Sequence, residues 1–138
     1  MIFLKYNKQQ GFKMFLISLA VLFFDQIAKF FALSSFSGFY LHKNYEIFFG
    51  LPFYSHLIFL LFLFLVIVFK RKFLSKCDNT IIFSFSLLIG GIVSNTLDRA
   101  LYGYVIDYLV FFHFFVFNFA DLAIFFGLLI ISWKIFRK

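Results

Sequence analysis

The sequence has little charge for its length. Charged residues make up 14% of the 138 residues, whereas apolar residues make up 64%. A soluble domain carries about 25% charged residues, which it needs to keep its surface polar. A lipid bilayer removes that need. The composition therefore argues against an ordinary soluble domain and indicates a membrane protein.

Cysteine is almost absent, and histidine is scarce. The single cysteine, Cys77, excludes an intramolecular disulfide, and the three histidines have no metal-ligand spacing. No Gly-x-Ser-x-Gly motif or Cys–His arrangement indicates a covalent nucleophile. The net charge of +7 is spread in short clusters between apolar runs. That pattern is typical of membrane topology and not of a nucleic-acid surface.

The sequence contains four long apolar stretches. A helix needs about 20 apolar residues to cross a hydrocarbon core of about 30 Å. The stretches predict transmembrane helices over residues 14–34, 51–69, 80–98 and 114–136, of which the second is short. We find no repeat and no linker. The chain, residues 1–138, is therefore expected to be a single all-α membrane domain.

The basic residues predict how these helices are oriented. Ten of the 13 lysines and arginines lie before the first span, between the second and third spans, and at the C-terminus. The positive-inside rule places these three segments in the cytoplasm, so both termini are expected inside. The segments 35–54 and 98–113 then lie outside. They contain glycines and strand-forming residues, which predict a small β-containing periplasmic segment.

The carboxylates are the strongest indication of a function. Asp25 and Asp121 fall within predicted spans, with Asp121 about seven residues, or roughly 10 Å, inside the fourth. A charge in hydrocarbon costs about 2.5–3.5 kcal/mol, so such a residue is a functional-site hypothesis by default. Asp107 lies in the second outer segment. Two carboxylates that meet at a wet boundary share a proton, and such a pair supports acid–base hydrolysis of a peptide bond.

Two asparagines share one spacing relative to these carboxylates. Asn95 precedes Asp98 by three residues, and Asn118 precedes Asp121 by three. Residues three apart lie on one face of a helix. Each asparagine is therefore expected to donate a hydrogen bond near its own carboxylate.

Asp25 and Lys29 are four residues apart in the first predicted helix. An acidic residue four positions before a lysine is the favourable order for an ion pair within a helix. We therefore expect a structural or positioning role for this pair, and not a role in the chemical step.

In chain order the polar motifs resemble those of one family. They are Asp25-Gln-Ile-Ala-Lys29, Asn44 followed by Phe49-Gly50, Gly90-Gly91 followed by Asn95 and Asp98-Arg99, Gly103-Tyr-Val-Ile-Asp107, and Phe117-Asn118-Phe-Ala-Asp121. They are similar to the motifs of the lipoprotein signal peptidases, or signal peptidase II family, which are bacterial intramembrane aspartyl peptidases. Two positions depart from the family pattern, since Glu46 replaces a usual glycine and Phe115 a usual proline.

The resemblance implies a reaction and a set of site residues. Asp107 and Asp121 would form the catalytic pair, which cuts a prolipoprotein on the N-terminal side of its lipid-modified cysteine. The residues expected to bind substrate or support the site are Asp25, Asn44, Asn95, Asp98, Arg99 and Asn118, with Lys29 in a structural role.

The resemblance also implies surroundings and partners for that reaction. The protein would lie in the bacterial inner membrane, with its active site toward the periplasm and in contact with phospholipid. It would bind globomycin-type inhibitors, and no metal, organic cofactor or nucleic acid is expected. One alternative is a structural subunit of a larger complex, which would explain the size but not polar motifs concentrated at one leaflet. The other is a small proton-coupled transporter, which would also place carboxylates in a membrane. Transporters of that kind usually show paired repeats and broken helices, which the sequence lacks.

Overall fold

The computed structural model describes residues 8–34, 41–45, 79–112 and 115–137, and most of them are helical. The helices are α1 (Lys8–Leu33), α3 (Asn79–Tyr102) and α4 (Phe119–Phe136). The short strands are β1 (His42–Asn44), β2 (Val105–Asp107), β3 (Leu109–Phe111) and β4 (Phe115–Phe117). The second predicted span, residues 51–69, lies outside the described residues.

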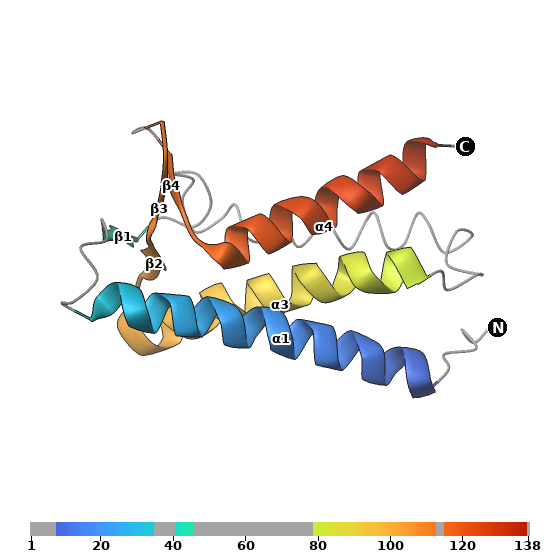
Figure 1. The fold of residues 1–138 in the computed structure, drawn as a ribbon, viewed down its shortest axis with the longest axis horizontal. Helices are drawn as coiled ribbons and strands as arrows, with labels where there is room; N and C mark the ends of the chain where they lie inside the picture. The colour runs from blue at the N-terminus through green and yellow to red at the C-terminus, as the bar shows by residue number, and fades with distance from the viewer. Residues whose placement is uncertain (1–7, 35–40, 46–78, 113–114, 138) are drawn as a thin grey trace.

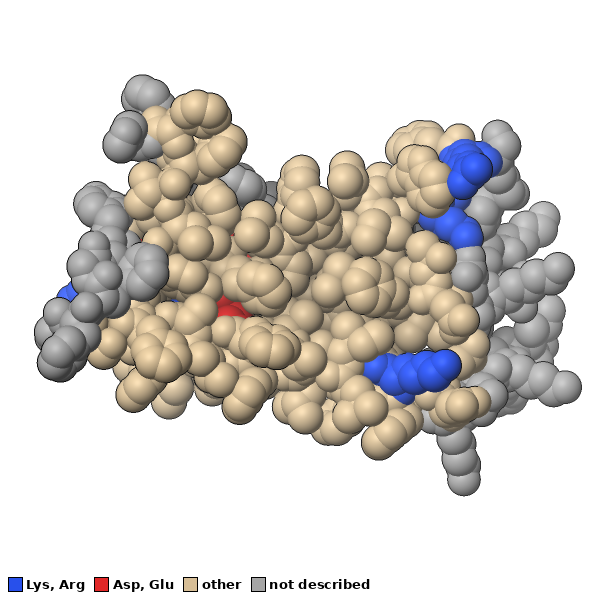
Figure 2. All heavy atoms as spheres, viewed as in Figure 1, with Lys and Arg blue, Asp and Glu red and all other residues tan. Residues whose placement is uncertain are grey.

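The three helices run side by side along the long axis of the molecule (Figure 1). Helix α3 packs against both α1 and α4. The first turns of α1 and α3 and the last turn of α4 lie at one end, whereas the strands lie at the other. The lysines and arginines on the face shown in Figure 2 gather mostly at the end away from the strands.

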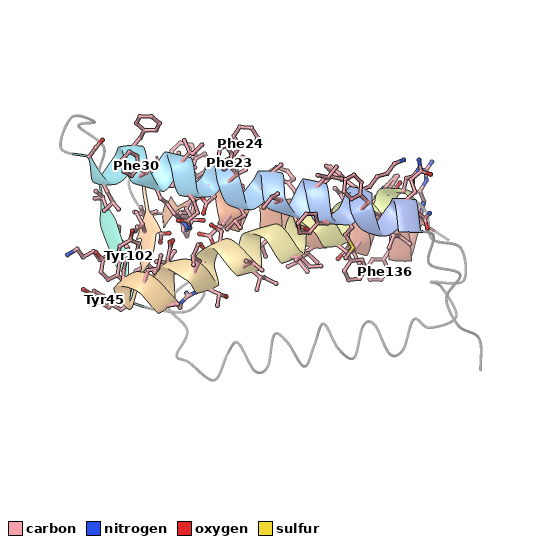
Figure 3. The ribbon with its side chains drawn as sticks, turned by 90° about the horizontal axis from the view of Figure 1, so that it is seen from below. Phe23, Phe24, Phe30, Tyr45, Tyr102 and Phe136 are labelled. Atoms are coloured by element: carbon pink, nitrogen blue, oxygen red, sulfur yellow. The ribbon has the colours of Figure 1, made fainter. Side chains whose placement is uncertain are left out.

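Two described helices are long and apolar enough to cross a membrane, namely Gln9–Leu33 and Asn79–Tyr102. Their outward faces are also apolar. Phe23, Phe24 and Phe30 of α1 are 60%, 61% and 69% exposed, and they point away from the other helices (Figure 3). A helix that is apolar on its outer face as well as its packed face suits lipid better than water. The mostly helical fold expected from the sequence is therefore present and fits a membrane protein.

Glycines allow α3 to approach both neighbouring helices closely. A Cβ atom at Gly90 would lie 2.7 Å from the Ser18 carbonyl oxygen on α1. A Cβ atom at Gly91 would lie 2.5 Å from the Ala120 carbonyl oxygen on α4. Both distances are shorter than van der Waals contact, so only glycine fits there. Small residues serve the same purpose in membrane helix packing generally.

Gly91→Ala is expected to lower the stability of the folded protein. The added methyl group meets backbone of α4, so the first turn of that helix must move. Overpacking of this kind costs about 1–3 kcal/mol, and the gain in helix propensity of about 1 kcal/mol offsets only part of it. Thermal unfolding in detergent measures the change. Thr96→Ala, on the exposed face of the same helix, is the control, and equal melting temperatures for the two variants would contradict the prediction.

The strands form two small antiparallel sheets, and β1, β2 and β3 lie in the segments where the sequence predicts β pairing. β1 pairs with β2, with His42 opposite Asp107 and Asn44 opposite Val105. β3 pairs with β4, with Leu109 opposite Phe117. The first sheet therefore joins the two segments that are predicted to lie outside, although more than 60 residues separate them along the chain.

Helix α4 begins at Phe119, later than the start at residue 114 that the sequence predicts. The preceding residues Phe115–Phe117 pair with β3 instead. Asn118 then has an extended backbone, with φ −129° and ψ 176°, and it forms a reciprocal capping box with Asp121. That motif starts a helix. Asp121 is consequently the third residue of α4, not a residue about seven positions inside a helix.

Candidate active site

A buried polar cluster lies between the three helices at the end that carries the strands. In Figure 2 the acidic side chains reach the visible surface only as a small patch surrounded by other residues. Polar side chains that are at most 7% exposed include Asp25, Lys29, Ser94, Asn95, Asp98, Asp107 and Asn118. Buried polar groups are costly unless they are hydrogen-bonded. Each of them should therefore have identifiable partners.

Lys29 is the cation at the centre of this cluster. Its Nζ atom lies 2.5 Å from Asp25 Oδ2 and 2.7 Å from Asp98 Oδ2. It also donates to Asn95 Oδ1 at 3.0 Å. The ion pair expected between Asp25 and Lys29 is present, and Asp98 from α3 joins it. The lysine therefore links α1 to α3 inside the protein.

Asp98 and Gln26 extend this link toward the strands. α3 continues to Tyr102, so Asp98 lies one turn inside the helix and not at its end. Its carboxylate accepts hydrogen bonds from Gln26 Nε2 at 2.8 Å and from the Ile106 backbone amide at 3.2 Å. Sequence reasoning gave Gln26 no role, because it is adjacent to Asp25 and shares no helix face with it. Its partner comes from another helix.

Asp107 lies at the end of β2 and is fully buried. Asn44 Nδ2 donates to its Oδ2 atom at 2.8 Å, and Asn118 Nδ2 donates to its Oδ1 atom at 2.7 Å. Asn44 is the last residue of β1, and Asn118 is the cap residue of α4. Two elements distant in sequence therefore hold this carboxyl group in one orientation.

Asp121 is oriented from two sides in the first turn of α4. Its Oδ2 atom accepts from the Asn118 backbone amide at 3.3 Å, and its Oδ1 atom accepts from Asn95 Nδ2 at 2.8 Å. The residue is only partly buried.

The side-chain amides of the two asparagines donate to carboxylates of other elements. Asn95 donates to Asp121 of α4 and not to Asp98, and Asn118 donates to Asp107 of β2. Asn118 Nδ2 also lies 3.2 Å from Asn95 Oδ1. The expected local pair was therefore wrong for Asn95, because the packing of α3 on α4 brings Asp121 closer to its amide. For Asn118 the local pair is present through the backbone amide, which donates to Asp121, whereas the side chain donates to Asp107 of β2. The result is a continuous hydrogen-bonded path from Asp107 to Asp121.

The surroundings of Asp107 favour its protonated form. Burial raises the pKa of this carboxyl group to about 6, and the charge of Asp121 acts in the same direction. The hydrogen bonds from Asn44 and Asn118 and the charge of Lys29 oppose the rise in pKa. A carboxyl group with this pKa can hold a proton at mildly acidic pH and release it near neutrality.

Arg99 lies in the last turn of α3, where a positive charge suits the helix dipole. Its guanidinium donates to the Asn95 carbonyl oxygen of the same helix at 3.3 Å. Glu46, where the sequence departs from the family pattern, lies outside the described residues. Among the residues that the structure describes, no three His, Cys, Asp or Glu side chains are grouped as metal ligands.

Comparisons with known proteins agree with one another. The family model described as signal peptidase (SPase) II matches residues 17–137. A lipoprotein signal peptidase from Wigglesworthia glossinidia brevipalpis is 41% identical over 102 residues, which cover 67% of this chain and 66% of that protein. A lipoprotein signal peptidase from Buchnera aphidicola subsp. Schizaphis graminum is 38% identical over 85 residues, which cover 59% of this chain and 51% of that protein. The chain thus matches two thirds or less of the length of these relatives.

Two solved structures described as bacterial membrane enzymes share the fold. The first has a TM-score of 0.68 and 23% sequence identity, and the match covers 91% of this chain and 88% of that one. The second has a TM-score of 0.67 and 22% identity, and the match covers 100% and 99% of the two chains. The arrangement of helices and strands described above is therefore that of an experimentally known membrane fold.

Proposed function

Because the chain belongs to the signal peptidase II family, we propose that it is an aspartyl endopeptidase that removes the signal peptide from lipid-modified prolipoproteins. The cut would fall on the N-terminal side of the diacylglyceryl-cysteine. The observation that carries this proposal is the hydrogen-bonded path that joins Asp107 to Asp121 through Asn118 and Asn95. The family match gives no support to the transporter alternative.

Asp107 and Asp121 are the proposed catalytic pair. With one proton shared between them, one carboxylate takes a proton from a water molecule, which then attacks the peptide carbonyl carbon. The partner donates its proton to the carbonyl oxygen and later helps to protonate the leaving amine. Asp107, with a pKa of about 6, is suited to keep the shared proton. The pair should titrate as a coupled unit.

The remaining site residues orient this pair in the proposal. Asn44 and Asn118 fix the Asp107 carboxyl group, and Asn95 fixes that of Asp121. Asp25, Asp98 and Lys29 form the ionic link beneath the pair, and Arg99 completes the supporting set on α3. We propose no metal or organic cofactor, since the two carboxyl groups and water supply every proton transfer of the hydrolysis.

The direct test is incubation of the purified protein with a lipidated prolipoprotein, followed by mass measurement. The expected product starts at the lipid-modified cysteine and has lost the mass of the signal peptide. The same precursor without its lipid is the control and should stay intact. A globomycin-type inhibitor should block the reaction, because a peptide ligand between the carboxyl groups excludes the attacking water. An intact lipidated precursor after long incubation would overturn the proposal.

We further propose four transmembrane spans, with both termini in the cytoplasm of a bacterial cell and the active site on the periplasmic side of the inner membrane. The placement of the strands at one end (Figure 1) and of most visible basic residues at the other (Figure 2) supports this orientation. The exposed phenylalanines of α1 support contact with phospholipid chains.

Labelling of single cysteines should confirm this orientation. With Cys77 replaced by serine, a cysteine at position 37 is expected to react with a membrane-impermeant maleimide applied from the periplasm. A cysteine at position 72 is expected to react only after the membrane is opened. Both positions lie in connections between the predicted spans, so neither substitution should disturb the site. Reaction at 72 in intact cells would contradict the orientation.

Asn44→Ala is expected to shift the pH dependence of cleavage. The lost hydrogen bond stabilised ionised Asp107, so its removal raises the pKa of Asp107 above about 6. The pair loses its shared proton as the pH rises through that pKa, and activity then falls. In the variant this fall should begin at higher pH, by roughly one unit. Rate–pH profiles measure it, with the exposed neighbour Tyr45→Phe as the control. An unchanged midpoint in Asn44→Ala would contradict the prediction.

A further inference from the structure

The first turn of α4 has four backbone amides with no partner inside the helix, as every helix has. All four are satisfied by side chains. Asn118 N and Asp121 N use the local capping box, at 3.3 Å and 2.9 Å. Phe119 N and Ala120 N have partners that come from elsewhere in the chain.

These two partners are Tyr108 and Asp25. Phe119 N donates to the Tyr108 hydroxyl oxygen at 3.2 Å, and Ala120 N donates to Asp25 Oδ1 at 3.0 Å. The Tyr108 hydroxyl itself lies 3.4 Å from Asp25 Oδ1, to which it donates. Half of the helix cap is therefore built from α1 and from the residue that follows β2.

Tyr108 is adjacent to Asp107, and this adjacency connects the cap to the proposed chemistry. Asp107 accepts a hydrogen bond from Asn118, the cap residue of α4, and the Tyr108 hydroxyl accepts one from the amide of the next residue, Phe119. The Tyr108 backbone amide also donates to the Phe117 carbonyl oxygen at 3.1 Å. Asp107 and Tyr108 thus both contact the start of α4, in the turn that carries Asp121.

The Tyr108 hydroxyl can serve this purpose throughout the working pH range. The side chain is only 8% exposed. Burial, followed by the charge of Asp25, raises the pKa of the Tyr108 phenol above its usual range. The phenol therefore stays protonated, donates to Asp25 and accepts from Phe119 N at the same time.

We propose that Tyr108 is a positioning residue: its hydroxyl holds the first turn of α4 against β2 and so sets the separation of the Asp107 and Asp121 carboxyl groups. This inference rests on the proposed peptidase function. It assigns Tyr108 no contact with substrate and no proton transfer. Without the hydroxyl, Phe119 N loses its partner, and the turn that carries Asp121 is held less tightly against β2.

Tyr108→Phe removes one oxygen atom and leaves the ring in place. Tyr104→Phe is the matched control, because Tyr104 lies in the same segment and none of the described hydrogen bonds uses its hydroxyl. For Tyr108→Phe we expect kcat to fall about tenfold with KM within about twofold of wild type. We also expect the alkaline fall in activity to move to lower pH, because a more distant Asp121 raises the pKa of Asp107 less.

Hydrogen exchange gives a readout that does not depend on cleavage. The amides of residues 119–121 should exchange faster in Tyr108→Phe than in wild type or Tyr104→Phe. If wild type fails to cut a lipidated prolipoprotein, the proposed function fails, and the exchange result still decides whether Tyr108 holds this turn. A variant with 4-aminophenylalanine at position 108 keeps a donor toward Asp25 but accepts poorly. It should resemble Tyr108→Phe in both assays, and it replaces that variant if Tyr108→Phe does not fold.

Two results would overturn the inference. The first is a Tyr108→Phe protein with the kcat, pH midpoint and exchange rates of Tyr104→Phe. The second is a loss of activity that only follows the amount of folded protein, with no shift of the pH midpoint. That pattern would show that the hydroxyl contributes to stability alone.

Discussion

Asp107→Asn and Asp121→Asn are each expected to abolish cleavage of the prolipoprotein, with kcat lowered by about a thousandfold or more. Hydrolysis needs one carboxyl group to take a proton from water and the other to supply one. An amide of nearly the same shape does neither. The hydrogen bonds around both residues come from several elements, so each variant should still fold.

Gel-shift cleavage assays on wild type and both variants measure this loss, with circular dichroism to confirm folding. Asp78→Asn is the matched control, because Asp78 lies in the predicted cytoplasmic connection and should not affect the rate. The double variant should be no slower than either single variant, since the two carboxyl groups act as one unit. Near-normal cleavage by a folded single variant would remove that residue from the catalytic pair.

Lys29→Met is expected to cause the largest loss of stability among single substitutions in the cluster. The lysine is 1% exposed and lies between two fully buried carboxylates, Asp25 and Asp98. Its removal leaves both negative charges without their cation. Breaking a buried ion pair in this way costs about 3–5 kcal/mol. The loss is expected to exceed that for Gly91→Ala.

Unfolding of the purified protein in mixed micelles measures the change in free energy. Lys43→Met is the control, because Lys43 is exposed on β1 and its nearest described partner is the Tyr104 ring at 5.2 Å. An exposed substitution of this kind should change stability by only about 0.5 kcal/mol. A Lys29→Met protein as stable as Lys43→Met would show that the buried carboxylates do not depend on this lysine.

The sequence by itself determined the features that depend on local spacing and composition. The length and apolarity of the runs predicted α1 and α3, because a bilayer requires long apolar helices. The spacing of Asp25 and Lys29 predicted their ion pair, since residues four apart meet on any helix. The strand formers around Asp107 predicted β pairing in the outer segments. Each of these inferences needs only the neighbouring residues.

Tertiary structure decided which groups meet across the bundle. Asp98 joins Lys29, and Asn95 reaches Asp121, only because α3 packs against α1 and α4 through Gly90 and Gly91. Local spacing assigned that asparagine a different partner, because helix geometry alone says nothing of what the next helix presents.

The start of α4 shows the same division. The apolar run predicted a helix from residue 114, but Phe115–Phe117 pair with β3, and the helix starts after Asn118. A run of apolar residues fits a strand or a helix equally well until a partner strand is present. The partner strand and the cap supplied by Tyr108 and Asp25 exist only in the folded chain. They place Asp121 in the first turn of α4, where hydrogen bonds through asparagine side chains join it to Asp107. The physical reason is that tertiary packing determines which groups lie close enough to pair with the backbone amides at a helix end.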